Sequence, residues 1–233
     1  MSNKTTYALG GVAVVVVALI VFALFRWNSG DGEIRNDGYG AAHDPAVSVA
    51  LDSDGAIVLG KPGVTKTVEL YEDPICPACG SLERIYGQEI AQQLDEGKIA
   101  VRYRLVNFLD EQSDSKDYST RAIAANECVA QNGDGVVYSK FHEQLFTTKQ
   151  PTEGSGDLSN TDLAAIATAA GAPADVAQCI TTGARLESAG NHAEAALTAL
   201  KAANDGKVAT PSVFINGNKI DWNDQEWVLT AAK

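Results

Sequence analysis

Positive charge is scarce in this sequence. Its 233 residues include 18 Lys and Arg against 30 Asp and Glu, which gives a formal net charge of -12. Binding to a phosphate backbone depends on clustered cations, so this charge balance excludes nucleic acid as an expected partner. The composition does not lack hydrophobic residues, which make up 45% of the chain, and it is therefore that of a folded protein.

Histidine and cysteine are also few, with three and four residues. The sequence has a single C-x-x-C motif, and a zinc site built on it would need two more ligands at metal-ligand spacing. No second pair exists, because the remaining candidates are isolated in sequence: His43, His142, His192, Cys128 and Cys179. We therefore predict no metal site and no cofactor.

Acidic residues are absent from the first 30 positions, which contain an apolar run over 7–25 between Lys4 and Arg26. About twenty helical residues cross a bilayer core, so this run is long enough to span a membrane. It is not followed by the small residues of a cleavage site. We predict a short cytoplasmic tail over 1–6 and an uncleaved, single-pass transmembrane anchor over 7–26, with a cleaved signal peptide as the alternative.

The stretch 27–45 is rich in Gly, Asp and Asn and has no apolar period, which predicts a flexible linker. The folded domain is then expected over 46–233. Its first part reads as two short strands, a third strand, an amphipathic helix and a strand with clean alternation. These elements are predicted at 47–51, 56–59, 68–71, 77–96 and 98–106.

Residues 116 to about 205 differ from the rest because they are rich in Ala and Leu and show helical spacing throughout. A hairpin turning at Gly217-Asn218 and a last helix from Gln225, capped by Asp224, follow this block. The order β-α-β, helical block, β-β-α predicts an α/β fold with a large all-helical insertion. The insertion's helices are expected at 119–131, 136–147, 160–170, 172–182 and 186–205.

The C-x-x-C motif, Cys76-Pro77-Ala78-Cys79, falls where a strand gives way to a helix. Pro77 suits the first helical turn, where a missing N–H has no cost. The free amides and the positive end of the helix then favour the thiolate of Cys76. We predict Cys76 as an exposed nucleophile of low pKa and Cys79 as a buried resolving thiol.

The other two cysteines, Cys128 and Cys179, lie on separate predicted helices. An even number of cysteines behind an apolar span is typical of an oxidising compartment. We predict a structural disulfide between Cys128 and Cys179 and an extracytoplasmic domain, with two buried free thiols as the alternative. Thr210-Pro211 precedes a strand, where a proline is tolerated without any functional reason.

Together, the segments Val68–Gly80 (VELYEDPICPACG) and Val208–Gly217 (VATPSVFING) resemble the thioredoxin superfamily and, within it, the DsbA-like disulfide oxidoreductases. The chain is most similar to the membrane-anchored DsbA-like proteins of actinobacteria, over about residues 50–233. The resemblance implies a thioredoxin-like fold and a cis Pro211 against the two cysteines. It also implies that Thr210 offers main-chain hydrogen bonds to a bound substrate.

The chain departs from the family at two positions. Thioredoxins keep a buried acidic residue six positions before the first cysteine, where this chain has Leu70. Glu72 and Asp73 lie nearer, but we interpret them as a turn at the end of the strand. DsbA has His at the second position between the cysteines, whereas this chain has Ala78, so one group that stabilises the thiolate is absent.

These observations predict a membrane-bound thiol–disulfide oxidoreductase with the domain outside the cytoplasm. The leading hypothesis is a dithiol oxidase acting on reduced or misoxidised exported proteins. The resemblance implies reoxidation by a DsbB-like or vitamin K epoxide reductase-like membrane protein. An isomerase or reductase with the same site, for example in cytochrome maturation, and a non-catalytic binding module are the alternatives.

Overall fold

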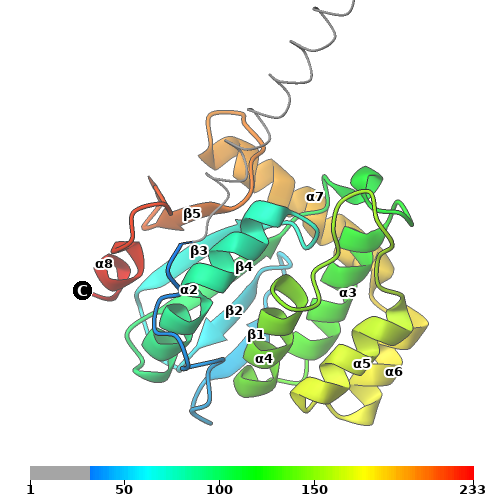
Figure 1. Ribbon diagram of the computed structural model, residues 1–233, viewed down its shortest axis with the longest axis horizontal. Helices are drawn as coiled ribbons and strands as arrows, with labels where there is room; N and C mark the ends of the chain where they lie inside the picture. Colours follow the sequence, from blue (N-terminus) through cyan, green and yellow to red (C-terminus); the bar gives the residue numbers. More distant parts are fainter. Residues whose placement is uncertain (1–31) are drawn as a thin grey trace, which may run out of the picture. The chain divides into compact units, whose positions relative to one another are not determined.

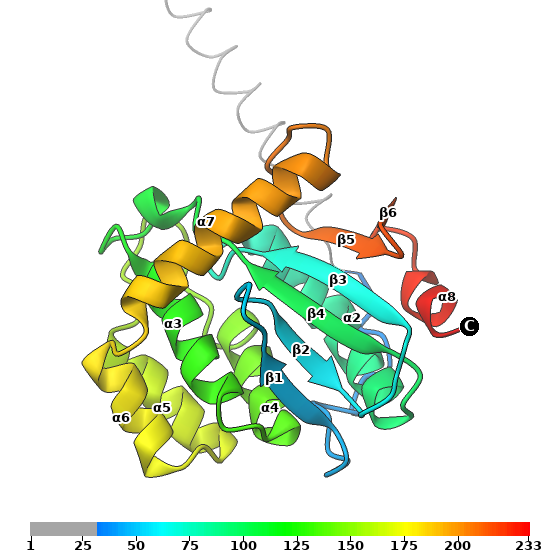
Figure 2. The same cartoon turned by 180° about the vertical axis from the view of Figure 1, so that it is seen from behind.

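Six strands form one mixed sheet in the order β1-β2-β4-β3-β5-β6 (Figures 1 and 2). The computed structural model describes residues 32–233, and residues 34–233 form one unit by their contacts with one another. β3 and β4 are parallel, and every other neighbouring pair is antiparallel. The strands are β1 (Ser48–Leu51), β2 (Ile57–Gly60), β3 (Thr67–Glu72), β4 (Ala100–Leu105), β5 (Ser212–Ile215) and β6 (Asn218–Ile220).

The centre of the fold is a β-α-β unit made of β3, helix α2 (Pro77–Asp95) and β4. Parallel strands need a crossover connection, and α2 provides it with an apolar face that includes Leu82, Ile90 and Leu94. α2 covers one face of the sheet and α7 (Leu186–Ala203) crosses the other (Figures 1 and 2). The unit therefore places the C-terminal end of β3 at the N-terminus of α2.

A block of five α-helices lies between β4 and β5, as the sequence predicts, after a short 3₁₀ turn at Asp110–Gln112 that the sequence analysis missed. Four of these helices gather beside the sheet, and the fifth, α7, returns across it (Figure 2). The thioredoxin-like α/β fold with a helical insertion is thus confirmed. The four helices are α3 (Tyr118–Ala130), α4 (Gly135–Phe146), α5 (Asn160–Ala170) and α6 (Ala174–Thr182).

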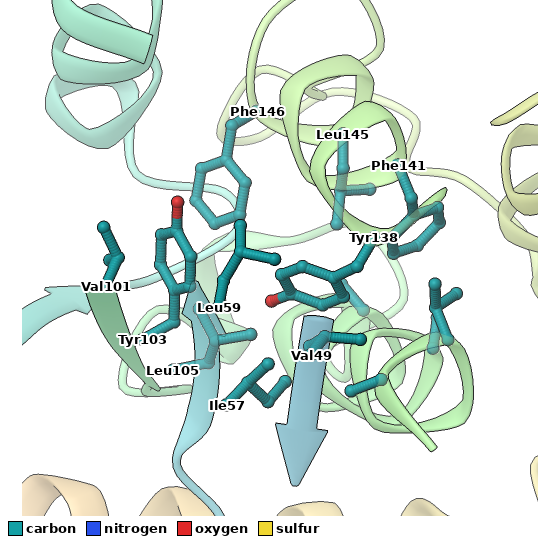
Figure 3. Packing of buried hydrophobic residues seen from close by; sticks show 14 of the residues in the cluster. Val49, Ile57, Leu59, Val101, Tyr103, Leu105, Tyr138, Phe141, Leu145 and Phe146 are labelled. Atoms are coloured by element: carbon teal, nitrogen blue, oxygen red, sulfur yellow. The ribbon is translucent and has the colours of Figure 1, made fainter. Parts of the chain in front are cut away.

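The insertion and the sheet share one hydrophobic core. Figure 3 shows aromatic side chains of α4, among them Tyr138 and Phe146, facing Leu59 of β2 and Tyr103 of β4. Large side chains of this kind bury most apolar area per residue, so the insertion is an integral part of the domain. A second, smaller core of Tyr71, Val106, Ala196, Leu200 and Phe214 packs α7 against the opposite face.

The segment before β1 differs from the predicted flexible linker. From Ile34 onward it lies along α2, where Arg35 donates to Glu89 and the Tyr39 hydroxyl donates to Asp95 at 2.8 Å. The main-chain N–H groups of His43 and Asp44 also donate to Asp95. The Gly- and Asp-rich composition suggested mobility, but these specific partners on α2 satisfy the segment's polar groups.

The C-terminal hairpin turns one residue earlier than predicted. Ile215 pairs with Asn218, so the two turn residues are Asn216 and Gly217, both with positive φ. Type I′ turns require positive φ at both central residues, which favours Asn-Gly over Gly-Asn here. The last helix, α8 (Trp227–Ala232), begins two residues later than predicted because Asp224 instead accepts from the N–H of Glu226 in the preceding turn.

The predicted cytoplasmic tail and anchor, 1–6 and 7–26, lie outside the described residues. Among residues 32–233, no helix is both long enough and apolar enough to cross a bilayer.

Candidate active site

Cys76 occupies the junction between β3 and α2. It is the N-cap residue of α2, with Pro77 in the first turn, and its N–H donates to the carbonyl of Asp73 at 2.9 Å. No side chain caps the helix, so the first-turn amides stay available to the sulfur of Cys76. The local sequence thus sets the position of the thiol at the positive end of α2.

The cis-proline segment lies against this thiol. The Thr210–Pro211 peptide bond is cis, and the Sγ of Cys76 is 3.5 Å from the carbonyl oxygen of Thr210, to which the thiol donates. β5 follows this segment directly and pairs with β3, which brings Thr210 and Cys76 together across 134 positions of sequence. The structure therefore juxtaposes the two motifs that carried the family resemblance.

Cys76 is less accessible than the sequence analysis predicted. Only 7% of its surface is exposed, while Cys79 is fully buried and Pro77 is exposed. The prediction of an exposed thiol is wrong, because the sulfur is buried against the carbonyl of Thr210, which precedes the neighbouring strand β5.

The environment separates the two thiols by their pKa. A hydrogen bond from the Cys79 thiol, together with bonds from the amides of Cys79 and Ala78, outweighs burial and lowers the pKa of Cys76 to about 6. Burial and the neighbouring Cys76 sulfur raise the pKa of Cys79 well above its usual range. At neutral pH the pair therefore combines one thiolate and one thiol, which suits a nucleophile and a resolving group.

Gln150, in the loop between α4 and α5, is a site residue that sequence reasoning missed. Its side-chain amide donates to the carbonyls of Cys76, at 2.9 Å, and Pro74, at 3.2 Å. Gly80 leaves room for this contact, since a Cβ there would lie 2.0 Å from Oε1 of Gln150. No signal short of the folded insertion identifies Gln150, because nothing in its own loop indicates that this loop reaches the motif.

Asp73 forms the predicted turn, but it is also fully buried. Its carboxylate accepts from the N–H of Ile75 at 3.2 Å, from the N–H of Leu109 at 3.0 Å and from the hydroxyl of Ser119. Burial outweighs these bonds and raises the pKa of Asp73 to about 7. Asp73 therefore ties the strand end to α3 and to the loop after β4.

Glu72 does not belong to the turn at the end of the strand, to which the sequence analysis assigned it. It is the last residue of β3, is fully buried and lies beside Glu83 of α2 and His142 of α4. Burial and the charge of Glu83 raise the pKa of Glu72, and the charge of Glu72 in turn raises that of Cys79. Leu70, by contrast, is an ordinary core residue.

The remaining predicted pair, Cys128 of α3 and Cys179 of α6, forms a disulfide with a Cα–Cα distance of 6.0 Å. It lies within the insertion and fastens two helices that are 51 positions apart. The free thiols among the described residues are those of Cys76 and Cys79. The four cysteines are thus divided into one bonded pair and one vicinal dithiol.

Comparisons with known proteins identify the family to which this fold belongs. The Thioredoxin family model matches residues 52–232. MdbA, a thiol-disulfide oxidoreductase from Corynebacterium diphtheriae, superposes with a TM-score of 0.71 at 30% identity, covering 82% of this chain and 95% of that one. Reduced DsbA from Mycobacterium tuberculosis superposes with a TM-score of 0.62 at 31% identity, covering 81% and 91%.

The serine/threonine-protein kinase PknE of Mycobacterium tuberculosis is 37% identical over 185 residues, which are 78% of this chain. The match covers 32% of the kinase, so the chain spans about a third of the length of this curated relative. The match to MdbA, by contrast, covers nearly the whole of that structure, and MdbA is a thiol-disulfide oxidoreductase. The chain therefore belongs to the thioredoxin family, as a DsbA-like thiol-disulfide oxidoreductase.

Proposed function

We propose that this protein is a dithiol oxidase that introduces disulfide bonds into exported proteins through Cys76 and Cys79. The observation that carries the proposal is the pairing of a thiol of low pKa at a helix N-terminus with a buried partner of high pKa. A thiol of low pKa is the better leaving group in thiol–disulfide exchange, so Cys76 leaves readily from its mixed disulfide with a substrate.

The reaction consists of two exchanges. A substrate thiolate attacks Sγ of Cys76, the Cys76–Cys79 bond breaks, and Cys79 leaves and takes up a proton. A second substrate thiolate then attacks the substrate sulfur of the mixed disulfide, and Cys76 leaves as a thiolate. The substrate has lost two electrons and gained a disulfide, and the Cys76–Cys79 pair has been reduced.

In this proposal, four residues form the surroundings of the two thiols: Pro77, Ala78, Thr210 and Pro211. Ala78 and Pro77 form the accessible rim, since Ala78 is half-buried and Pro77 is exposed. The main chain of Thr210 is already in contact with the attacked sulfur. A substrate strand paired with that segment would therefore place its own sulfur beside Cys76.

The test is a pair of single substitutions in the full chain, assayed on a reduced protein substrate. Cys76→Ser is expected to abolish oxidation. Cys79→Ser, mixed instead with a substrate that carries a disulfide, is expected to accumulate the mixed disulfide: the Cys76 thiolate attacks the substrate disulfide, one substrate sulfur leaves as a thiolate, and no Cys79 thiol is present to resolve the bond. A mixed disulfide that forms in Cys76→Ser and not in Cys79→Ser would reverse the two roles and contradict the proposal.

The setting we propose is a cell membrane, with 7–26 as the anchor and the domain on the extracytoplasmic side. The disulfide between Cys128 and Cys179 supports this side, because such bonds persist in oxidising compartments. A DsbB-like or vitamin K epoxide reductase-like membrane protein would reoxidise the pair. A membrane-impermeant thiol reagent should label Cys76 in intact cells whose disulfides have been reduced; labelling only after lysis would place the domain inside.

A further inference from the structure

Three ionisable side chains meet in the interior on the face of the sheet covered by α2 and α4. Glu72 comes from the end of β3, Glu83 from α2 and His142 from α4. Their exposed fractions are 0%, 5% and 2%. The rings of Tyr103 and Phe146, labelled in Figure 3, lie 4.2 and 4.5 Å from the His142 ring, centroid to centroid.

The polar atoms of this cluster lack hydrogen-bond partners. Within residues 32–233, both carboxylate oxygens of Glu72, Oε1 of Glu83 and both ring nitrogens of His142 are buried without an acceptable donor or acceptor. Leaving a buried polar group unpaired costs about 1–3 kcal/mol, and more for a charged one. A single cation placed among the three groups would satisfy all of them at once.

The spacing of these atoms is that of ligands around one metal ion. Nε2 of His142 lies 3.3 Å from Oε2 of Glu72 and 3.4 Å from Oε1 of Glu83, with directions that do not suit hydrogen bonds. Ligands at about 2.0–2.1 Å from a tetrahedral Zn²⁺ are about 3.3–3.4 Å from one another. One donor atom from each of the three residues falls within a span of 4.8 Å.

Charge and donor type point to the same class of ion. Two carboxylates and a neutral imidazole sum to a double negative charge, which a divalent cation cancels without a shared proton. Carboxylate oxygen and imidazole nitrogen are ligands of Zn²⁺ and related transition metals. A Ca²⁺ site would instead need six or more oxygens.

A small cavity adjoins the cluster and provides the remaining position. Its volume is about 20 Å³, and Glu83, His142 and Ser139 line it, together with Gly40 and Ala41 of the segment along α2. About 10–15 Å³ is enough for one water molecule. The cavity therefore has room for one water molecule as the fourth ligand.

We propose that Glu72, Glu83 and His142 form a binding site for one divalent transition-metal ion of the zinc type, with water as the fourth ligand. The site is separate from the C-x-x-C motif and needs no thiolate. It fastens β3, α2 and α4 at one point, so its occupancy stabilises the contact between the insertion and the thioredoxin core. It does not depend on which direction of thiol–disulfide exchange the protein catalyses.

The test uses the full chain with Cys76 and Cys79 joined as a disulfide, so that neither thiol can bind metal. Chelator-treated protein is equilibrated with Zn²⁺ alone, freed of excess metal and analysed for bound zinc. One zinc per chain is expected, with a higher melting temperature than that of the metal-free protein, because a ligand that binds only the folded state stabilises it. Oxidised protein that binds no zinc overturns the proposal.

Variants locate the bound ion. Glu83→Gln keeps the shape of the side chain and His142→Gln replaces the ring with a polar amide, and each is expected to lose the bound zinc and the zinc-dependent rise in melting temperature. His43→Gln is the matched control, because His43 is an exposed histidine outside the cluster, and it should keep one zinc. Folded Glu83→Gln or His142→Gln that retains stoichiometric zinc also overturns the proposal.

Discussion

At the residue scale, Cys76 shows how a local sequence and a distant segment act on one sulfur. Its place at the N-cap of α2 follows from the strand-to-helix boundary, and the amides of Ala78 and Cys79 favour the thiolate there. The Thr210–Pro211 segment then buries it. The result is a buried thiol of low pKa.

The alkylation rate of reduced protein should report this pKa. We expect the rate constant of Cys76 with a small reagent to rise with pH and to level off above a midpoint of about 6, rather than near 9. Cys79 should stay unreactive in the folded state throughout this range, because it is buried and its pKa is raised. A single midpoint above pH 8 would show that the amides and the Cys79 thiol do not stabilise the thiolate.

The same shift links stability to pH with a definite sign. The pKa of Cys76 is lower in the folded state, so its contribution stabilises the reduced protein above about pH 9 and is lost as the pH falls through 6. The oxidised protein has no such thiol. The stability of the reduced form relative to the oxidised form should therefore increase from pH 6 to pH 9, as measured by denaturant unfolding of both.

Gly80, at the start of α2, leaves room for the side chain of Gln150 and the main-chain carbonyl of Phe146. A Cβ there would lie 2.8 Å from the carbonyl oxygen of Phe146 as well as 2.0 Å from Gln150, and a main-chain atom cannot rotate away. Gly80→Ala is expected to lower the free energy of unfolding by about 1–3 kcal/mol and to release Gln150 from Cys76.

Gly190 is the control for this substitution, since it lies within α7 and a Cβ there meets nothing within 4 Å. Gly190→Ala should raise the free energy of unfolding by about 0.5–1 kcal/mol through the loss of chain entropy alone. Chemical denaturation of both variants checks the pair. Equal effects would mean that the loop with Gln150 moves freely away from α2.

At the element scale, the disulfide joins α3 to α6 across a loop of 51 positions. In the chain-entropy model, closing a loop of that length is worth about 4 kcal/mol. Replacing both Cys128 and Cys179 by Ala should lower the free energy of unfolding by up to about that amount. Because the bond is far from the motif in sequence and lies within the insertion, the reactivity of Cys76 in the folded variant should not change.

The helical patterns predicted the ends of α3 to α7 to within a few residues. Each helix has an apolar stripe at helical spacing, and the same stripe is buried in the folded domain. The 34–44 segment was misjudged for the opposite reason. It has no pattern of its own, and its order comes from partners on α2 such as Glu89 and Asp95. Segments held by side chains of another element carry no periodic signal.

At the scale of the whole molecule, the reduction potential decides between oxidase and reductase. A thiol with a pKa of about 6 is stabilised at pH 7 by about 1.4 kcal/mol over an ordinary one, which makes the pair about 30 mV more oxidising. Thioredoxin and a strong oxidant differ by about 150 mV, so this thiolate accounts for about a fifth of the interval.

We expect a potential above about -170 mV for the full chain at equilibrium with glutathione, as an oxidase requires. The rest of the shift must come from other contacts of the reduced pair, because the hydrogen bond between the two sulfurs already contributes to the lowered pKa of Cys76. A value below about -230 mV would favour a reductase supplied with electrons from outside. Quantifying the free and bonded thiols across a series of glutathione ratios measures it.

The sequence by itself determined the features that are local. The position of Cys76 and Cys79 at a strand-to-helix boundary, the β-α-β order and the helical insertion all follow from periodicity and turn residues. The pairing of Thr210 with Cys76 was expected from family resemblance, not from any local pattern, and the structure provides it through the pairing of β5 with β3.

Only the tertiary structure decided which distant side chains share one place. Gln150 reaches Cys76 from a loop of the insertion, and Glu72, Glu83 and His142 come from a strand and two helices with no common spacing. The absence of paired histidines argued against a metal in the sequence, yet ligands need to be adjacent only in space. Burial of these groups changes their pKa values, and it depends on how the insertion packs on the sheet. It therefore cannot be predicted from one segment of the sequence at a time.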